Sequence, residues 1–501
     1  MPAGIPVPPD LSERLPAQAR REYCSTLLTR LLPLDQFIPD CYAQWRPLLR
    51  DAMGFIAASL STPRLYPKVA EQLGLPEDTV PQKRLTAFMA RMPVLQKLGQ
   101  TIARNRHLDA GLRAELTLLE DMIRDITTEE VQSRIRTLLG PRLQRHGVVL
   151  EDMIHAEASV SAVLGFSWNG AARGRKRGVF KVLKPFIPEH YREELEIVRQ
   201  LALYLGERSQ STPLANVDFN KIFDDVRCLM EREIDSDNEQ ANLASARRRF
   251  QQVAGVRVPS LIPELCAPGL TAMSFEDGAK ITDIYHGDPR RRNRLARRLA
   301  EALIAVPLFS AAEQVEFHAD PHAGNLYYDE SGDELIILDW ALTETLDREQ
   351  RRLITLMLAA VMLRDESLIC TSLGYLCGDS NGDLLRDQVR CFIRGLSPLS
   401  LPGLEHVLGL LDGLFQAGMV FPTSLLIFRK VLLTLDGILH EMELKLPLEN
   451  VLGEYLLTGY GAGHTSLPLS NTDLWSLWWS ANWMGARVGM QTGARLLRPE
   501  R

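Results

Sequence analysis

The residues best suited to do chemistry lie in one short stretch, His318–Asn325, which reads HADPHAGN, and in Asp339 shortly after it. Phosphoryl transfer requires one carboxylate that orients the acceptor, and an amide and a second carboxylate that hold magnesium against the phosphates. Asp320, Asn325 and Asp339 fit these three roles. We expect His318 to brace the loop, because the reaction leaves no proton-transfer step for it.

The spacing inside this stretch is informative. An Asp followed five residues later by an Asn matches the catalytic loop of kinases, in which a pair of strands then delivers the metal-binding Asp. Alternatively, Asp320 and Asn325 only form turn hydrogen bonds beside Pro321 and Gly324, as such residues often do.

Lys181 supplies a candidate cation for the phosphates, because it lies inside the apolar segment GVFKVLKP. The aliphatic part of a lysine can pack in such a strand while its ammonium reaches a site. A buried amine requires a counter-charge, and Glu233 and Glu239 offer one from a segment predicted to be helical. The alternative is that Lys181 and Lys184 extend into solvent from an edge strand and that the glutamates are solvated. The order of strand Lys, helix Glu and then Asp, Asn and Asp favours a kinase-like site.

The elements that would carry these residues form a small mixed part and a larger helical part. Val- and Phe-rich strands are predicted in the first, together with a helix over Asp218–Phe250. The second is helical except for a loop at HADPHAGN that is followed by a strand, a turn and another strand. This order predicts an α+β, protein-kinase-like bilobal fold. The predicted segments are a helical N-terminal extension (1–85), a further helical segment (86–150), a mixed N-lobe (151–278), a mainly helical C-lobe (279–465) and a Trp-rich amphipathic C-terminal segment (466–501).

The composition indicates a globular protein with a large core, since 46 % of the 501 residues are hydrophobic and 24 % are charged. The 57 basic and 63 acidic residues leave a net charge of −6, which argues against nucleic acid as a partner. The seven cysteines form no disulfide framework or zinc pattern, and the N-terminus has no features of an export signal. We therefore expect a cytoplasmic protein, and nothing in the sequence favours a particular oligomeric state.

Four motifs give the chain a specific resemblance to a known family. They are KLGQ (Lys97–Gln100), AEASVSAV (Ala156–Val163), EID (Glu233–Asp235) and HADPHAGN with Asp339. These motifs resemble the KxGQ motif, the alanine-rich loop, the ExD segment and the catalytic and metal loops of the UbiB/AarF family of atypical protein-kinase-like proteins. The resemblance spans about Leu95–Ala341, and KxGQ with the alanine-rich loop is its most specific part, because ordinary kinases carry neither.

The resemblance implies a protein that binds ATP and Mg²⁺. Lys181 would contact the α- and β-phosphates and pair with Glu239, and Asp320 would be the catalytic carboxylate. Asn325 and Asp339 would bind magnesium. Further nucleotide contacts would come from the alanine-rich loop, through Ala158, Ser159 and Val160. The resemblance implies a regulatory role for residues of the KxGQ and ExD motifs, namely Lys97, Gln100, Glu233 and Asp235.

The chain also departs from the family pattern. Glu157 occupies a position that is usually alanine, which would place an anion near the phosphates and weaken nucleotide affinity, and Ala162 replaces a usual glutamine. Ser274 takes a hinge-strand position often held by Glu, and the triplet Asp339–Ala341, DWA, replaces a DFG-like triplet. The metal-binding Asp is retained.

The C-terminal segment places four tryptophans on one predicted helical face, ahead of several arginines: Trp475, Trp478, Trp479 and Trp483. Such a face suits a helix lying on an anionic membrane or contacting proteins of lipid metabolism. Alternatively, it docks on the protein's own helices. A peripheral membrane location is therefore one expectation.

These observations predict a UbiB/AarF-like atypical kinase or ATPase that supports isoprenoid-quinone or other membrane-lipid metabolism. Two alternatives stay open. The first is a small-molecule kinase of the aminoglycoside or choline type, whose catalytic and metal loops resemble HADPHAGN and LDWA. The second is a catalytically silent nucleotide-binding scaffold, for which Glu157 is the best indication.

Overall fold

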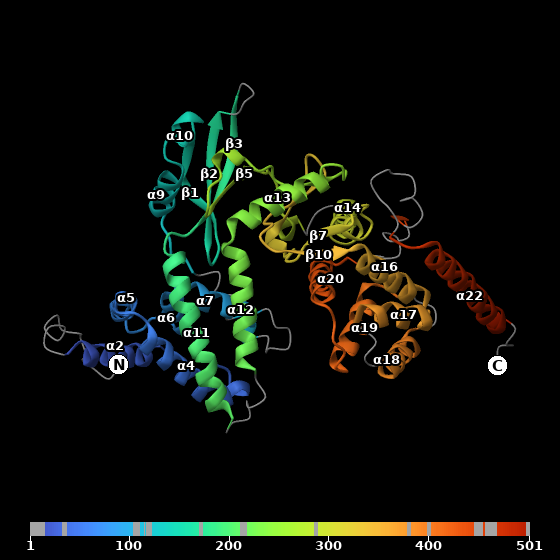
Figure 1. The fold of residues 1–501 in the computed structure, drawn as a ribbon, viewed down its shortest axis with the longest axis horizontal. Helices are drawn as coiled ribbons and strands as arrows, with labels where there is room; N and C mark the ends of the chain where they lie inside the picture. Colours follow the sequence, from blue (N-terminus) through green and yellow to red (C-terminus); the bar gives the residue numbers. More distant parts are fainter. Residues whose placement is uncertain are drawn as a thin grey trace. The chain divides into compact units, whose positions relative to one another are not determined.

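A computed structural model of the chain describes residues 16–32, 38–103, 111–114, 116, 123–169, 174–210, 218–284, 289–377, 382–397, 402–444, 454–455 and 468–496. It describes only the backbone of residues 17, 100–103 and 484–496. The chain divides into two compact units (Figure 1): the first contains Met1–Asn238 and Ile262–Phe275, and the second contains Glu239–Leu261 and Glu276–Arg501. The predicted N-lobe segment, 151–278, is therefore shared between both units.

The first unit is built around a four-stranded antiparallel sheet with the strand order β1-β2-β3-β5. Its strands are β1 (Val149–Glu157), β2 (Ser161–Asn169), β3 (Arg175–Leu183) and β5 (Leu270–Ser274). The helix α9 (Thr128–Leu139) packs on one face, over the stacked rings of Phe166 and Phe180. A Cβ atom at Gly178 would lie 2.6 Å from the Phe166 ring, so only glycine fits there.

A layer of helices completes the first unit. Its helices other than α9 are α2 (Ala17–Leu31), α4 (Arg46–Ser59), α5 (Thr62–Gly74), α6 (Pro81–Met89), α7 (Pro93–Ala103), α10 (Pro141–Arg145), α11 (Ile187–Ser209) and α12 (Phe219–Ile234). The long helix α11 contacts α4, α7 and α12. One apolar cluster joins α11 to the N-terminal helices, and a second, which includes Val94, Val198 and Met230, joins it to α7 and α12. The KLGQ motif therefore lies on a helix that is packed into this layer.

The prediction of one continuous helix over Asp218–Phe250 is wrong, because the structure has two helices there, α12 and α13 (Ser236–Phe250). Asp235 has a non-helical backbone, with φ −82° and ψ 84°. Its carboxylate accepts the N–H of Asn238 at 3.0 Å. An Asp in this position stabilises the start of a new helix better than it continues the old one. As a result, Glu233 and Glu239 lie on different helices.

The second unit contains two small sheets. One has the order β4-β9-β8-β6 and the other pairs β7 with β10. Their strands are β4 (Val256–Arg257), β6 (Ala279–Lys280), β7 (Gln314–His318), β8 (Leu326–Asp329), β9 (Glu334–Ile337) and β10 (Thr343–Asp347). The predicted strand, turn and strand after HADPHAGN are confirmed by the antiparallel pair β8 and β9.

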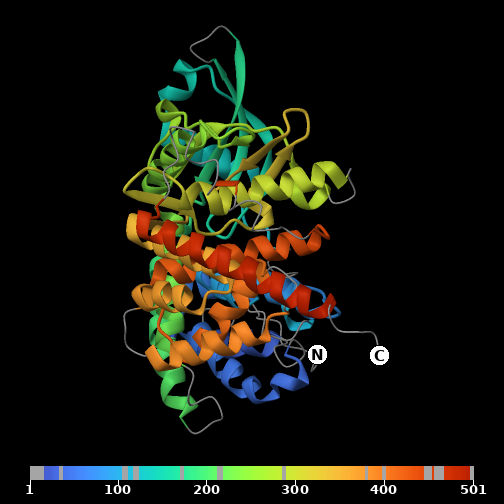
Figure 2. The ribbon, with the colours of Figure 1, turned by 90° about the vertical axis from the view of Figure 1, so that its right-hand side faces the viewer.

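Helices form the rest of the second unit, as predicted. After α14 (Pro289–Ala300) and the short helices η4 (Glu301–Ala305) and α15 (Val306–Leu308), they are α16 (Arg348–Leu363), α17 (Glu366–Cys377), α18 (Gly382–Gly395), α19 (Leu404–Gln416), α20 (Thr423–Glu441) and α22 (Asn471–Leu496). Asp347 and Gln350 cap the start of α16 reciprocally. The C-terminal helix α22, red in Figure 2, packs against α16. None of the helices in the described part of the chain has the length and apolarity needed to cross a bilayer.

Candidate functional site

His318 ends β7 and holds the loop that follows it. Its Nδ1 accepts the backbone N–H of Asp320 at 3.1 Å, and its Nε2 lies 3.1 Å from the carbonyl oxygen of Leu338. A ring that accepts at Nδ1 carries its proton on Nε2, which then donates to Leu338. Burial lowers the pKa of His318 below its ordinary value, so the neutral ring is favoured. These are the contacts of a bracing residue.

The loop between Asp320 and Asn325 folds into a tight turn. The carbonyl oxygen of Asp320 accepts the N–H of His322 at 2.8 Å and the side-chain amide of Asn325 at 3.4 Å. The carbonyl oxygen of Asn325 accepts the N–H of Leu338 at 2.8 Å. Leu338 therefore bonds to both ends of the loop, and this brings Asp339, the next residue, beside Asp320 and Asn325. The structure thus gathers the three residues predicted to carry the chemistry.

Asp339 is held in an uncommon conformation. Its φ is +52°, in the left-handed region that few residues other than glycine adopt. The next residue, Trp340, is buried, and its indole N–H donates to the carbonyl of Ile337 at 3.2 Å. The carbonyl of Trp340 accepts the side-chain amide of Asn242 at 3.2 Å. The Trp of the DWA triplet therefore anchors the backbone that presents Asp339. Strained backbone of this kind concentrates at functional sites.

The donor set suits magnesium. Asn325 and Asp339 offer oxygen atoms, and Mg²⁺ is commonly held by one or two protein oxygens together with water and substrate phosphates. Among the residues that the structure describes, no group of three His, Cys, Asp or Glu side chains is arranged to hold a metal. The oxygen donors of Asn325 and Asp339 make this loop a candidate magnesium site, and the assignment stays a prediction.

Lys430 is a site residue that the sequence did not reveal. Its Nζ lies 2.8 Å from Oδ1 of Asp320. It belongs to α20, whose Phe428 is buried edge-on against Phe317 of β7. The two charged residues are separated by more than a hundred positions along the chain, so no local motif could have linked them.

The nucleotide-binding residues predicted in the first unit lie at the β1–β2 turn and on β3. Lys181 lies in the middle of β3, opposite Val163 of β2 and Thr271 of β5, as expected for a strand lysine. Ala158, Ser159 and Val160 form the turn that joins β1 to β2. The carbonyl of Val160 accepts the N–H of Lys184 at 2.9 Å, which fastens this turn to the end of β3.

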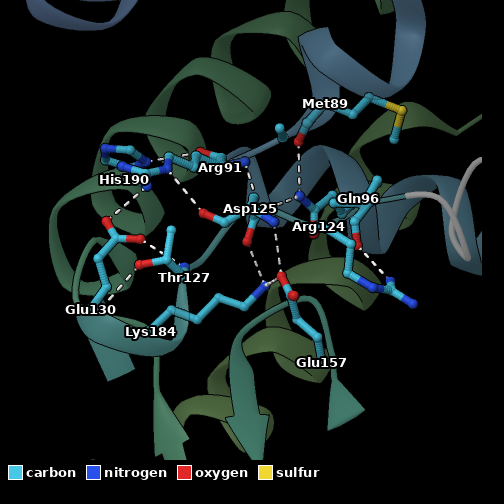
Figure 3. Close-up of polar contacts among 12 residues, drawn as sticks. Met89, Arg91, Gln96, Arg124, Asp125, Thr127, Glu130, Glu157, Lys184 and His190 are labelled. Atoms are coloured by element: carbon cyan, nitrogen blue, oxygen red, sulfur yellow. Dashed lines mark hydrogen bonds and ion pairs between the residues drawn. The ribbon is translucent and has the colours of Figure 1, made fainter. Parts of the chain in front are cut away.

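A buried ionic cluster lies beneath the turn (Figure 3). The Nζ of Lys184 lies 2.6 Å from the carboxylate of Asp125 and 2.9 Å from that of Glu157. All three side chains are at most 5 % exposed. Glu157 also accepts the backbone N–H of Asp125 at 2.9 Å. Sequence reasoning missed this cluster, in which Lys184 is an internal residue and does not extend into solvent.

Asp125 connects this cluster to α7. Its second oxygen accepts the backbone N–H of Arg91 at 2.7 Å and the amide of Gln96 at 3.1 Å. Burial opposes ionisation, but Lys184 and these hydrogen bonds hold the pKa of Asp125 below its ordinary value. The carboxylate of Glu157 is therefore paired with Lys184 inside the protein, and its expected effect on nucleotide affinity stays a prediction.

The KxGQ and ExD residues are arranged as follows. Lys97 of α7 forms an ion pair with Glu233 of α12, and both side chains are largely buried. Asp235 caps α13. The side chain of Gln100 lies outside the described part of the chain. Lys181 belongs to the first unit and Glu239 to the second, and their pairing stays a prediction.

The fold and these motifs define an atypical kinase-like protein. The model of the ABC1 atypical kinase-like domain matches residues 118–373, and the chain belongs to this family. Its fold is α+β and kinase-like, as predicted, and the resemblance to UbiB/AarF proteins is confirmed.

Individual relatives agree with this assignment. The chain is 25 % identical over 363 residues to "Probable protein kinase UbiB" of Haemophilus ducreyi, which covers 69 % of this chain and 65 % of that protein. It is 24 % identical over 388 residues to "ACTIVITY OF BC1 COMPLEX KINASE 7, chloroplastic" of Arabidopsis thaliana, covering 75 % of this chain and 54 % of that one. The chain therefore spans less than two thirds of each of these relatives.

A solved structure shares the fold. It is described as "The complex structure of Rv3197-erythromycin from Mycobacterium tuberculosis", has 19 % sequence identity and a TM-score of 0.50, and covers 80 % of this chain and 98 % of its own.

Proposed function

We propose that this protein binds ATP with Mg²⁺ and either hydrolyses it slowly or transfers its terminal phosphoryl group to an acceptor. The observation that carries the proposal is the set of bonds through which His318 and Leu338 fix Asp320, Asn325 and Asp339 together. Catalysis of phosphoryl transfer depends mainly on such positioning and on neutralisation of charge.

Each residue has a distinct role in this proposal. Asp320 orients the attacking hydroxyl or water and takes its proton, and Asn325 and Asp339 would hold Mg²⁺, which neutralises phosphate charge when bound. Lys181 contacts the α- and β-phosphates and has Glu239 as its counter-charge. A double-mutant cycle of Lys181→Ala and Glu239→Gln tests this pair: coupled effects on nucleotide affinity support it, and independent effects remove it.

The metabolic setting of this activity is inferred from the family, and the acceptor is not identified by it. By resemblance to UbiB/AarF proteins, the activity supports isoprenoid-quinone or other membrane-lipid metabolism. Glu157, the main indication for the scaffold alternative, has its carboxylate paired with Lys184, so this alternative is not favoured.

One experiment separates the candidate functions. The purified protein is incubated with γ-labelled ATP and magnesium, together with either membranes or a panel of amino alcohols, and the label is then located. Free phosphate or labelled lipid supports the proposal. A labelled amino alcohol indicates a small-molecule kinase, and intact ATP despite binding indicates a scaffold.

A peripheral membrane location is the second part of the proposal. The four Trp side chains of α22 are 54 to 70 % exposed. The opposite side of this helix is attached to its own unit, since Asp473 pairs with Arg352 of α16 at 2.8 Å and Leu477 is buried. Between Trp483 and Glu500 the sequence contains arginines and no acidic residue. Exposed indoles beside basic residues suit an anionic lipid surface.

Vesicle sedimentation tests this location. We expect the protein to sediment with vesicles that contain phosphatidylglycerol and not with phosphatidylcholine alone. Replacing Trp475 and Trp479 by Ser should abolish sedimentation. Tyr375→Ser, at another exposed aromatic side chain, is the control. Equal sedimentation of the double variant would exclude this face as the lipid contact.

A further inference from the structure

The pair formed by Lys430 and Asp320 is more than a contact between two mobile surface side chains. The carboxylate is 12 % exposed and the lysine side chain 43 % exposed. Asp320 is fixed through its backbone by His318. Exposed pairs contribute little because both partners must be immobilised, whereas here one partner is already in place.

The helix that carries Lys430 is also fixed against the loop. Phe428 and Val431 are fully buried, and the ring of Phe428 lies 5.7 Å from that of Phe317, one residue before His318. Arg429, which lies between Phe428 and Lys430 on α20, forms its ion pair with Asp412 of α19. The neighbouring side chains thus hold α20 in place and leave Lys430 directed at Asp320.

The chemistry of the loop calls for a cation at this point. In phosphoryl transfer, charge is spread over the oxygens of the transferring group, and a carboxylate beside that group repels it. The loop from Asp320 to Asn325 contains no Lys or Arg. Lys430 brings a positive charge to the carboxylate from a different element.

We propose that Lys430 is a further catalytic residue, whose ammonium contacts both Asp320 and the terminal phosphoryl group of ATP. This role rests on the proposed function. The acceptor oxygen forms a bond to the γ-phosphorus, the bond to the β,γ-bridging oxygen breaks, and ADP leaves with the bonding electrons. The acceptor proton passes to Asp320. Lys430 keeps its proton throughout and offsets the repulsion between carboxylate and phosphoryl group.

Lys430 belongs to a part of the chain that the family model does not match. It lies beyond residues 118–373, the segment matched by the family model. A cation for the reaction would thus be supplied by a helix outside the family segment. The flexible stem of a lysine allows one ammonium to serve both oxygens.

The test compares Lys430→Met and Lys430→Arg with Arg429→Met, which removes an ion pair from the same helix. Hydrolysis is measured together with equilibrium binding of MgADP and of a non-hydrolysable MgATP analogue. For Lys430→Met we expect kcat to fall roughly 100-fold and affinity for the analogue about 10-fold, with affinity for MgADP unchanged. Lys430→Arg should recover part of both losses, and Arg429→Met should change neither.

Each other result overturns the role. A rise in kcat for Lys430→Met would show that the pair blocks Asp320. Equal losses for MgADP and the analogue would show a structural effect, and no change would show that Lys430 is not involved. A wild type that binds neither nucleotide would overturn the proposed function, and this role with it. A wild type that binds but does not hydrolyse would refute turnover alone, and the two affinities would still decide the contact.

Discussion

The imidazole of His318 accepts the backbone N–H of Asp320, so the ring must be unprotonated at Nδ1 for the catalytic loop to hold its shape. Because burial lowers the pKa of His318 from 6.5, the unfolded chain takes up a proton at higher pH than the folded chain does. The protein should therefore lose stability as the pH falls from 6.5 through the folded-state pKa.

Urea unfolding between pH 7.5 and 5 measures this effect. In His318→Gln, the side chain can still accept one hydrogen bond and donate another but cannot titrate. The difference in unfolding free energy between wild type and variant should shrink as the pH falls. A constant difference would show that His318 does not contribute to the pH dependence.

Glu194 should make the stability of the protein change with pH in the opposite direction to His318. It lies on α11, pairs with Arg64 and accepts the N–H of Val94 at the start of α7. Burial raises its pKa from 4.5 to about 7 despite Arg64. Between pH 4.5 and 7 the folded state thus retains a proton that the unfolded state loses. As the pH rises through this range, the wild type should lose up to about 3 kcal/mol of stability relative to Glu194→Gln. Parallel stability curves would contradict this prediction.

Lys184→Met should be strongly destabilising, because it leaves the carboxylates of Asp125 and Glu157 buried without a counter-charge. We expect a loss of about 3–5 kcal/mol in the free energy of unfolding. Arg199→Met, which removes an exposed ion pair with Glu196, should change the free energy of unfolding far less than Lys184→Met does. Denaturant unfolding of both variants provides the comparison, and similar small losses would show that the cluster is not stabilising.

Lys97→Ala should raise nucleotide turnover or self-phosphorylation. The ion pair with Glu233 joins α7 to α12, and charge-assisted contacts of this kind are roughly twice as strong as neutral hydrogen bonds. By resemblance, the KxGQ helix covers the active site, so its release should increase access. Turnover is compared at equal MgATP occupancy, with the exposed Lys83→Ala as control. A variant that binds nucleotide but stays inert would assign KLGQ to packing.

Asp339→Asn should abolish magnesium-dependent stabilisation by nucleotide. The substitution removes one ligand charge and leaves the phosphate repulsion uncompensated. The thermal shift produced by MgATP is compared with that produced by ATP and a chelator. An undiminished magnesium-dependent shift in the variant would refute the metal assignment.

The parts of the site that could be predicted are those encoded locally. The strand with Lys181 follows from the Val- and Phe-rich run Val179–Leu183, and the hairpin after HADPHAGN follows from its turn residues. In each case, neighbouring residues determine the local structure.

The parts that were missed depend on long-range or competing effects. β1 is largely exposed, so it lacks the alternation that marks a half-buried strand. The break at Asp235 arises because its carboxylate caps α13, which competes with helix continuation. Lys430 and the Lys184 cluster join residues that are far apart in the chain, and no local pattern records such contacts.

The cluster of Lys184, Asp125 and Glu157 also sets a condition on how this chain can diverge from its ancestors. A lineage that loses only the lysine keeps two unpaired carboxylates, and one that loses only Glu157 leaves the N–H of Asp125 without its acceptor. These positions, separated by up to 59 residues, therefore depend on one another: losing one member leaves another without its partner. In descendants of this sequence we expect them to persist together or to be replaced together.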